Sequence, residues 1–298
     1  MRIVEILRLL LAAPLLALNV TVHALPILAL ALLKLIPVAA WRARVSALLV
    51  ALGENWIAVN NRLLDDLTRT RVEVEYTGLA LQKSGWYLVI ANHQSWVDIP
   101  ILQRVLLHRI PFLKFFLKQQ LIWVPLLGLV WWAMDFPFMR RYSRTEIARR
   151  PELKGRDLDA TRKACARFRQ IPVSVMNFIE GTRYTAAKHA AGDPALQHLL
   201  PPRAGGVAYV MQAMGDAIET LVDVTIHYPS GIPTMVDLLC GRVRQVRVRI
   251  HASPIPAELR SGDYEDDAEY RARFQSWVNG LWRAKDIDLR GMRQRAAA

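Results

Sequence analysis

Cysteine is scarce in this sequence, and its scarcity excludes several classes of protein. Only Cys165 and Cys240 occur among the 298 residues, so a small disulfide-stapled fold and a cysteine-rich zinc fold are excluded. Cys165 lies in a helix-like stretch, where a buried structural thiol is a better interpretation than a nucleophile. No spacing of histidine, cysteine and acidic residues indicates a metal site, and we expect none.

Acidic residues are too few to balance the basic ones. The chain has 39 lysine and arginine residues against 26 aspartate and glutamate residues, which gives a formal net charge of +13. Such a balance favours an anionic partner: nucleic acid, acidic phospholipid or a phosphorylated small molecule. The basic residues are scattered and form no basic–aromatic cluster, so nucleic acid is not expected.

Long apolar runs, by contrast, are present, and the first occupies residues 9–40. It could form one tilted transmembrane helix, two shorter helices bent near Pro26 that enter and leave one leaflet, or a signal peptide cleaved after Ala24. More arginines follow the run than precede it, so the positive-inside rule places the bulk of the chain in the cytoplasm. We therefore predict a membrane anchor at residues 1–45 and the main domain at residues 46–298.

A second apolar run, residues 121–134, is too short to span a bilayer. Its tryptophans suit a bilayer interface, because the indole ring is apolar with one polar N–H group. A buried core helix explains the same run equally well, so both interpretations stay open.

The rest of the chain alternates between strand-like and helix-like stretches. Apolar patterning predicts strands at 71–79, 85–93, 136–141, 173–183, 220–229 and 241–252. Helical periodicity predicts helices at 45–67, 95–109, 157–170 (with Asp157 as a possible N-cap), 204–215 and 266–287, followed by a frayed tail at 291–298. This order favours an α/β fold with helices flanking a mixed, mostly parallel sheet.

The sequence Asn-His-Gln-Ser follows one of these buried strands, at residues 92–95. Asp98 comes five positions after His93, where its carboxylate could accept a hydrogen bond from His93 Nδ1 and leave Nε2 to take a proton from a hydroxyl. This would be the base and orienting acid of a triad, with the acceptor alcohol as nucleophile. Alternatively, Ser95 and Asp98 are only a helix capping box, with Ser95 as N-cap.

A second polar sequence, Glu180-Gly181-Thr182-Arg183, follows another predicted buried strand. Gly181 permits a tight backbone turn, Thr182 offers a hydroxyl, and Arg183 carries a fork of donors suited to phosphate. A surface turn with a solvated arginine would explain the same tetrapeptide. Its place after a buried strand, in the same chain as His93, favours the functional interpretation.

These two motifs, in this order, resemble those of the 1-acylglycerol-3-phosphate acyltransferase (PlsC-like) family of glycerolipid and lysophospholipid acyltransferases. The resemblance covers residues 86–228 and implies acyl transfer from acyl-CoA or acyl-carrier protein to a lysophospholipid hydroxyl, without a cofactor. It assigns His93 as general base and Asp98 as the residue that orients it. The substrate-binding residues that it implies are Asn92, Phe138, Arg140, Arg141, Glu180, Gly181, Thr182 and Arg183.

The sequence departs from the family pattern at two acids. Asp135 stands where the second motif has glycine, and Asp223 stands where the fourth motif has proline. A carboxylate near a phosphate site would repel a dianionic monoester unless a cation neutralises it. The acceptor could therefore be 1-acylglycerol-3-phosphate, lysophosphatidylglycerol, lysocardiolipin or glycerol-3-phosphate. Lys114, Lys118 and Arg203 are further candidates for contacts with anionic substrates.

The resemblance also implies a location and partners. Because one substrate sits in a phospholipid membrane, the enzyme is expected at the inner (cytoplasmic) membrane with its catalytic domain facing the cytoplasm. A membrane-anchored basic protein that binds lipid without catalysis is the alternative of another class. Turnover of labelled acyl-CoA distinguishes the two.

Overall fold

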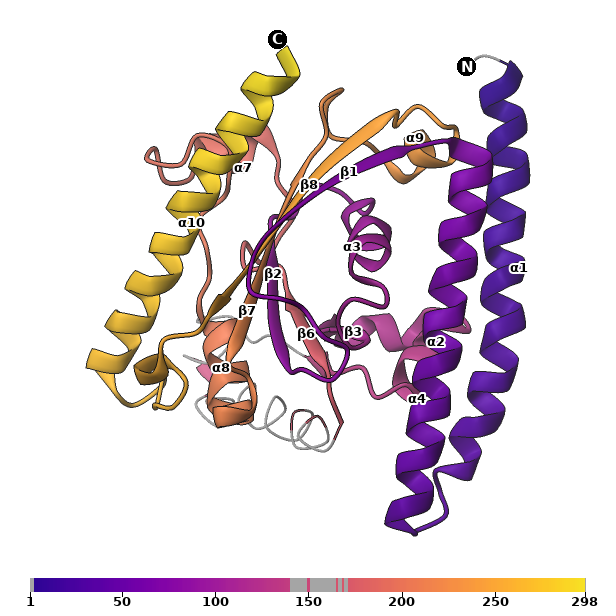
Figure 1. Cartoon of the computed structure of the whole chain (residues 1–298), viewed down its shortest axis with the longest axis horizontal. Helices are drawn as coiled ribbons and strands as arrows, with labels where there is room; N and C mark the ends of the chain where they lie inside the picture. Colours follow the sequence, from indigo (N-terminus) through magenta and orange to yellow (C-terminus); the bar gives the residue numbers. More distant parts are fainter. Residues whose placement is uncertain (1–2, 140–148, 151–164, 166–167, 169–170, 298) are drawn as a thin grey trace.

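A six-stranded sheet forms the centre of the computed structural model, which describes residues 3–139, 149, 150, 165, 168 and 171–297 (Figure 1). Its strand order is β1-β8-β7-β2-β6-β3, and only the β7–β8 pairing is antiparallel. The bounds are Arg71–Gly78 (β1), Tyr87–Ala91 (β2), Leu113–Phe115 (β3), Ser174–Asn177 (β6), Thr220–His227 (β7) and Gln245–Pro254 (β8). The prediction of a mixed, mostly parallel sheet is confirmed.

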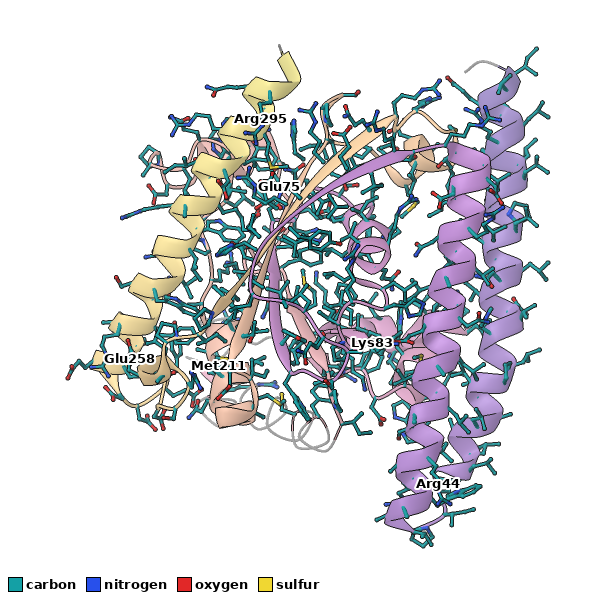
Figure 2. All side chains as sticks on the ribbon, in the orientation of Figure 1. Arg44, Glu75, Lys83, Met211, Glu258 and Arg295 are labelled. Carbon is teal, nitrogen blue, oxygen red and sulfur yellow. The ribbon has the colours of Figure 1, made fainter. Side chains whose placement is uncertain are left out.

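Helices cover both faces of this sheet (Figure 1). One face carries α1 (Ile3–Leu33), α2 (Ala39–Thr68), α3 (Asp98–Leu106) and α4 (Leu127–Ala133), and the other carries α8 (Gly205–Met214) and α10 (Ala268–Ala297). Two buried apolar clusters result, one on each face. Figure 2 shows Met211 of α8 among the side chains of the second cluster, where it is fully buried.

The strand patterns have a simple physical cause. All five residues of β2 are buried because the strand lies between β7 and β6 with helices on both faces. In β8 the apolar residues from Val246 to Ile250 face the core, while Arg247 and Arg249 alternate with them on the less buried side. Shorter elements complete the fold: β4 (Leu117–Lys118) paired with β5 (Phe138–Met139), 3-10 turns at Gln119–Trp123, Gly215–Ala217 and Ala257–Leu259, and helices α7 (Ala186–Ala190) and α9 (Met235–Leu239).

Helices α1 and α2 form a hairpin along one side of the molecule (Figure 1). Of the alternatives for this segment, two helices bent near Pro26 are not what the structure shows: α1 continues through Pro14 and Pro26, and the chain turns back only after Leu33. Polar side chains join the two helices, since Asn19 Nδ2 donates to Asn60 Oδ1 at 2.8 Å and Asn55 Nδ2 lies 3.1 Å from His23 Nε2. Packing against α2 keeps α1 straight where its prolines weaken it.

Helix α1 is long and apolar enough to cross a membrane, and within the described residues it is the only such helix. Its two ends are both held by the rest of the molecule. Arg242, which follows α9, forms an ion pair with Glu5 at 3.1 Å, and Asp135, which follows α4, pairs with Lys34. Much of the outward surface of α1 is exposed leucine, isoleucine and valine.

The apolar run at 121–134 combines both of its predicted interpretations. Val130 and Ala133 of α4 are buried in the core beside α1. Trp123 and Trp132 point away from it, with 84% and 59% of their surfaces exposed. One side of the segment therefore packs in the core, and the other presents two indoles to the surroundings.

Two other predicted boundaries are wrong. Helix α3 begins at Asp98 with Val97 as its N-cap, so Ser95 is not the N-cap. The tail at 291–298 was expected to fray, but α10 continues to Ala297 because Met292 is buried against the sheet side and its carbonyl accepts a bond from Arg247 Nη1 at 3.4 Å. The helix predicted at 157–170 lies largely outside the described residues.

Candidate active site

His93 lies in the loop after β2, with its ring held on two sides. The ring stacks on Phe178 with centroids 3.9 Å apart and planes 14° from parallel. Its Nδ1 lies 2.9 Å from Asp98 Oδ2, and an ionised carboxylate can only accept, so Nδ1 carries the proton. The lone pair is therefore on Nε2, the nitrogen that a base would use.

Asp98 is completely buried and accepts four hydrogen bonds. Its Oδ2 receives the His93 ring N–H and the backbone N–H groups of Gln94 at 2.6 Å and Ser95 at 2.8 Å. Its Oδ1 receives the Tyr228 hydroxyl at 2.7 Å. Burial and the nearby Asp98 raise the pKa of Tyr228 well above its usual value, so this hydroxyl stays protonated and donates. These donors offset the cost of burying the carboxylate and fix its position.

The predicted capping box is only half formed. Asp98 accepts the Ser95 backbone N–H, but the Ser95 hydroxyl accepts from Val97 N–H at 3.1 Å and donates to the Pro233 carbonyl at 2.5 Å. The Asp98 carboxylate thus folds back over the loop that carries His93. One arrangement both starts α3 and orients the imidazole.

The second polar loop follows β6, the strand next to β2, and its backbone is tied to His93. Glu180 Oε1 accepts the His93 backbone N–H at 3.1 Å, and Tyr184 N–H donates to the His93 carbonyl at 2.8 Å. Both parallel strands end at the same edge of the sheet, which is why the loops meet.

Glu180 is buried beneath this junction, with only 2% of its surface exposed. Burial raises its pKa to about 8, although the hydrogen bond from His93 N–H acts in the opposite direction. The sequence suggested a substrate contact for Glu180. The structure gives its side chain the role of joining two loops.

The next three residues of this loop lie nearer the surface. Gly181 has φ +69°, a left-handed conformation that glycine adopts without strain, as its predicted role requires. The Arg183 guanidinium lies over the ring of Trp96 at 4.8 Å. Thr182 accepts a hydrogen bond from Lys188 Nζ at 2.7 Å. The loop and Lys188 of α7 therefore present a hydroxyl and two cations beside the His93 loop.

The remaining predicted substrate-binding residues are Asn92, Phe138, Arg140 and Arg141. The side-chain amide of Asn92 pairs with the backbone of Ile226: Nδ2 donates to the Ile226 carbonyl at 2.9 Å, and Oδ1 accepts the Ile226 N–H at 2.8 Å. The side chain of Asn92 therefore extends the β2–β7 pairing. Phe138 lies on β5 in the separate two-stranded sheet. Arg140 and Arg141 lie outside the described residues.

The two acids that depart from the family pattern are each paired with a lysine. Asp135 has φ +59°, a left-handed conformation that glycine adopts without strain, and it pairs with Lys34, the residue directly after α1. Asp223 on β7 pairs with Lys285 of α10, whose side chain is fully buried. Lys285 also donates to the Val224 carbonyl at 2.7 Å.

Sequence patterns alone assigned no role to Tyr228, Trp96, Lys188 or Lys285. Tyr228 could have been suspected, because it ends the third buried strand at the same edge as His93. The pairing of Lys285 with Asp223 depends on how distant elements pack, which no local pattern reveals. Lys188, in contrast, lies only six positions after its partner Thr182.

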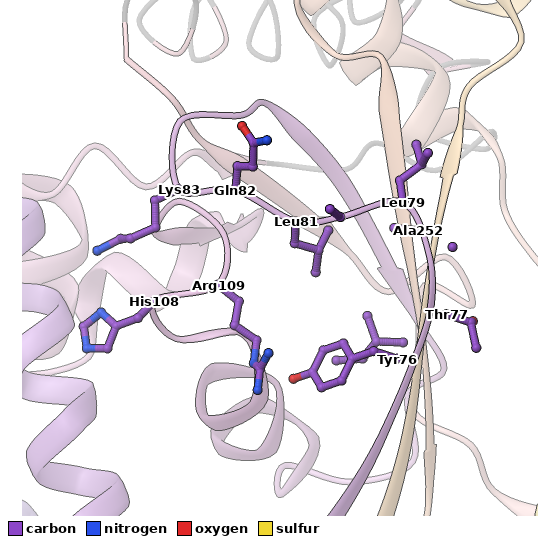
Figure 3. Close-up of a pocket in the computed structure, with 12 residues that line it drawn as sticks. Tyr76, Thr77, Leu79, Leu81, Gln82, Lys83, His108, Arg109 and Ala252 are labelled. Atoms are coloured by element: carbon purple, nitrogen blue, oxygen red, sulfur yellow. The ribbon is translucent and has the colours of Figure 1, made fainter.

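A cavity of about 450 Å³ lies at the other end of the sheet (Figure 3). Tyr76, Lys83, His108 and Arg109 line it together with the loop after β1, and Arg109 lies 4.2 Å from the centre of the Tyr76 ring. This loop precedes β2, whereas His93 follows β2. The cavity is therefore separate from the His93 centre. Among the described residues, no group of three histidine, cysteine or acidic side chains could hold a metal ion.

Comparisons with known proteins agree with this geometry. A family model described as Acyltransferase matches residues 73–229. The 1-acyl-sn-glycerol-3-phosphate acyltransferase delta of Mus musculus is 26% identical over 213 residues, 67% of this chain and 51% of that protein. A probable 1-acyl-sn-glycerol-3-phosphate acyltransferase 5 of Arabidopsis thaliana is 26% identical over 78% of this chain and 60% of its own. The chain thus spans about half the length of the mouse relative.

The fold is also that of a solved structure. The crystal structure of the 1-acyl-sn-glycerophosphate (LPA) acyltransferase PlsC from Thermotoga maritima superposes with a TM-score of 0.52 at 16% identity. The match covers 95% of this chain and 97% of the other.

Proposed function

This chain belongs to the acyltransferase family, and from that membership we propose that it moves a fatty acyl group from an acyl thioester to the free hydroxyl of 1-acylglycerol-3-phosphate. The observation that carries the proposal is the His93–Asp98 pair, with Nδ1 and Oδ2 2.9 Å apart and the carboxylate completely buried. This pair has the two properties that a general base needs: a fixed tautomer and a partner for the imidazolium that forms.

The chemistry needs no nucleophile from the protein. His93 Nε2 accepts the proton of the acceptor hydroxyl while the hydroxyl oxygen bonds to the thioester carbonyl carbon. The tetrahedral intermediate then breaks its carbon–sulfur bond, and the proton on Nε2 passes to the departing sulfur. One ester is formed, one thioester is lost, and His93 returns to its starting state.

The charges around the second loop support a phosphate-bearing acceptor. Arg183 offers a guanidinium fork on the same edge of the sheet as His93. The objection that Asp135 would repel a phosphate monoester is weakened, because Lys34 neutralises that carboxylate. The acyl donor is proposed to be acyl-CoA or acyl-carrier protein, both anionic and therefore attracted to a chain of net charge +13. No cofactor is required.

The exposed apolar side of α1 supports membrane association. Because Glu5 and Lys34 hold both ends of α1 to the rest of the molecule, we propose that the helix lies along one leaflet rather than crossing the bilayer. The exposed Trp123 and Trp132 would enter the interface beside it. The proposed location is the inner membrane, with the catalytic domain facing the cytoplasm.

Acyl transfer by a His93→Ala variant tests the proposal. Turnover of labelled acyl-CoA with 1-acylglycerol-3-phosphate in detergent micelles should fall by about 10³-fold, within the range that positioned general bases contribute. His251→Ala, on the exposed surface of β8, is the matched control and should keep wild-type turnover. Near-normal turnover by His93→Ala, with its thermal unfolding unchanged, would contradict the mechanism.

A further inference from the structure

Helix α7 folds the chain back over the loop that carries Thr182 and Arg183. The helix is a single turn, and its N-cap Thr185 accepts the backbone N–H of Lys188 at 3.3 Å. The Lys188 ammonium then reaches Thr182 Oγ1 at 2.7 Å and the Arg183 carbonyl at 3.1 Å. Both partners of the Lys188 ammonium among the described residues are neutral oxygen atoms, so neither of them cancels its charge.

The position of Arg183 is also restricted, by a contact with Trp96. Its guanidinium lies 4.8 Å from the centre of the Trp96 ring, and Trp96 belongs to the loop that carries His93. About half of the Trp96 surface is exposed, so a ligand can approach both the ring and the guanidinium. Stacking on an aromatic face limits the arginine to few orientations and leaves its N–H donors free.

The hydrogen bonds within the loop leave donors available for an anion. Lys188 has three N–H groups and uses two of them. Because Thr182 Oγ1 accepts from Lys188, its own hydrogen is free to donate. The Arg183 fork supplies further donors, and the bond from Tyr184 N–H to the His93 carbonyl holds all of them close to the base.

We propose that Lys188 is a second cation of the acceptor headgroup site and that it makes the site selective for a phosphate monoester over a phosphate diester. A phosphate monoester carries a charge of about −1.5 to −2 at neutral pH, because its second pKa is near 6. A phosphate diester carries a single charge. Arg183 alone balances the diester, and the additional charge of the monoester is balanced by Lys188. This inference rests on the proposed acyl transfer and names the residue that chooses its acceptor.

The test compares two acceptors with one acyl donor. The initial rates of the wild type and of Lys188→Gln are measured with 1-acylglycerol-3-phosphate and with lysophosphatidylglycerol, in the same detergent. Lys188→Gln should raise the KM for the monoester about tenfold and that for the diester less than about threefold, with both kcat values nearly unchanged. Lys188→Arg should recover most of the monoester KM, because it restores the charge.

A matched control separates local recognition from the net charge of the protein. Lys83→Gln removes the same charge in the loop before β2, at the far end of the sheet, and should leave both KM values unchanged. An equal rise of both KM values in Lys188→Gln, the same effect in Lys83→Gln, or a wild type that prefers the diester would overturn the inference while leaving acyl transfer in place. Failure of the wild type to acylate either acceptor would instead remove the proposed function, and this inference with it.

Discussion

The hydroxyl of Tyr228 donates a hydrogen bond to Oδ1 of Asp98 at 2.7 Å, although the two residues are 130 positions apart in the sequence. The carboxylate is thus held from two sides, by His93 and its loop at Oδ2 and by Tyr228, which directly follows β7, at Oδ1. Since Asp98 orients His93, Tyr228 determines indirectly where the imidazole of the proposed base points. We regard Tyr228 as a positioning residue.

Tyr228→Phe removes this hydroxyl and keeps the ring. Turnover is expected to fall about tenfold, the loss of one hydrogen bond to a buried charge, with the acceptor KM within twofold of wild type. The acid limb of the pH profile of kcat/KM should move to higher pH, because a carboxylate with fewer donors stabilises the imidazolium more strongly. A pH profile that superposes on the wild-type profile would show that the tyrosine is only a packing residue.

The buried Glu180 should make the folded protein less stable as the pH rises, which is the opposite of the usual effect of a carboxyl group. Burial raises its pKa from 4.5 to about 8, so the folded protein binds a proton there that the unfolded chain releases. The stability contributed by this proton is complete below about pH 4.5 and is lost as pH rises to about 8, by up to about 1.4 kcal/mol for each pH unit. The melting temperature of Glu180→Gln relative to wild type, measured from pH 5 to 9, should therefore rise with pH; a constant difference would exclude the shift.

Removing one partner of the ion pair between Lys285 and Asp223 should destabilise the fold strongly, whereas replacing both partners by apolar residues should destabilise it little. Lys285→Met leaves the Asp223 carboxylate, whose side chain is 15% exposed, without its cation and is expected to lower the free energy of unfolding by about 3 kcal/mol. The double variant Lys285→Met with Asp223→Leu should recover most of this loss. Arg290→Met, on the exposed side of α10, serves as the control and should change stability by less than about 0.5 kcal/mol.

Substitutions of Asp135 can separate the effect of backbone strain on stability from the effect of its ion pair with Lys34. Both Asp135→Gly and Asp135→Ala remove the partner of Lys34, but only glycine accepts φ +59° without strain. Thermal unfolding should show Asp135→Gly to be the more stable of the two by about 1 kcal/mol. Equal stabilities would mean that the left-handed conformation relaxes when the carboxylate is lost.

The orientation of α1 can be measured by labelling cysteines at its two ends. The native Cys165 and Cys240 are buried, so Ile3→Cys and Leu35→Cys introduce sites that a membrane-impermeant maleimide can report separately. If α1 lies along one leaflet, both sites react from the cytoplasmic side of inner-membrane vesicles. Reaction of the two sites from opposite sides would show that α1 crosses the membrane.

Much of the fold was predictable because each sequence pattern that indicates it spans only a few neighbouring residues. The continuous apolar run of β2, the alternation of Arg247 with Val248 in β8 and the glycine at 181 each reflect a local constraint on burial or backbone angle. The two polar loops could be located for the same reason, since each directly follows a buried strand. The predicted proximity of His93 and Asp98 also needs only five residues of chain.

The sequence by itself therefore determined the α/β architecture, the two loops and the pairing of His93 with Asp98. Only the tertiary structure decided that Tyr228 supports Asp98 and that the two unexpected acids are neutralised by Lys34 and Lys285. Those relationships depend on the order of the strands and on which helices cover each face of the sheet. Such contacts join residues far apart in the chain, so no local pattern encodes them.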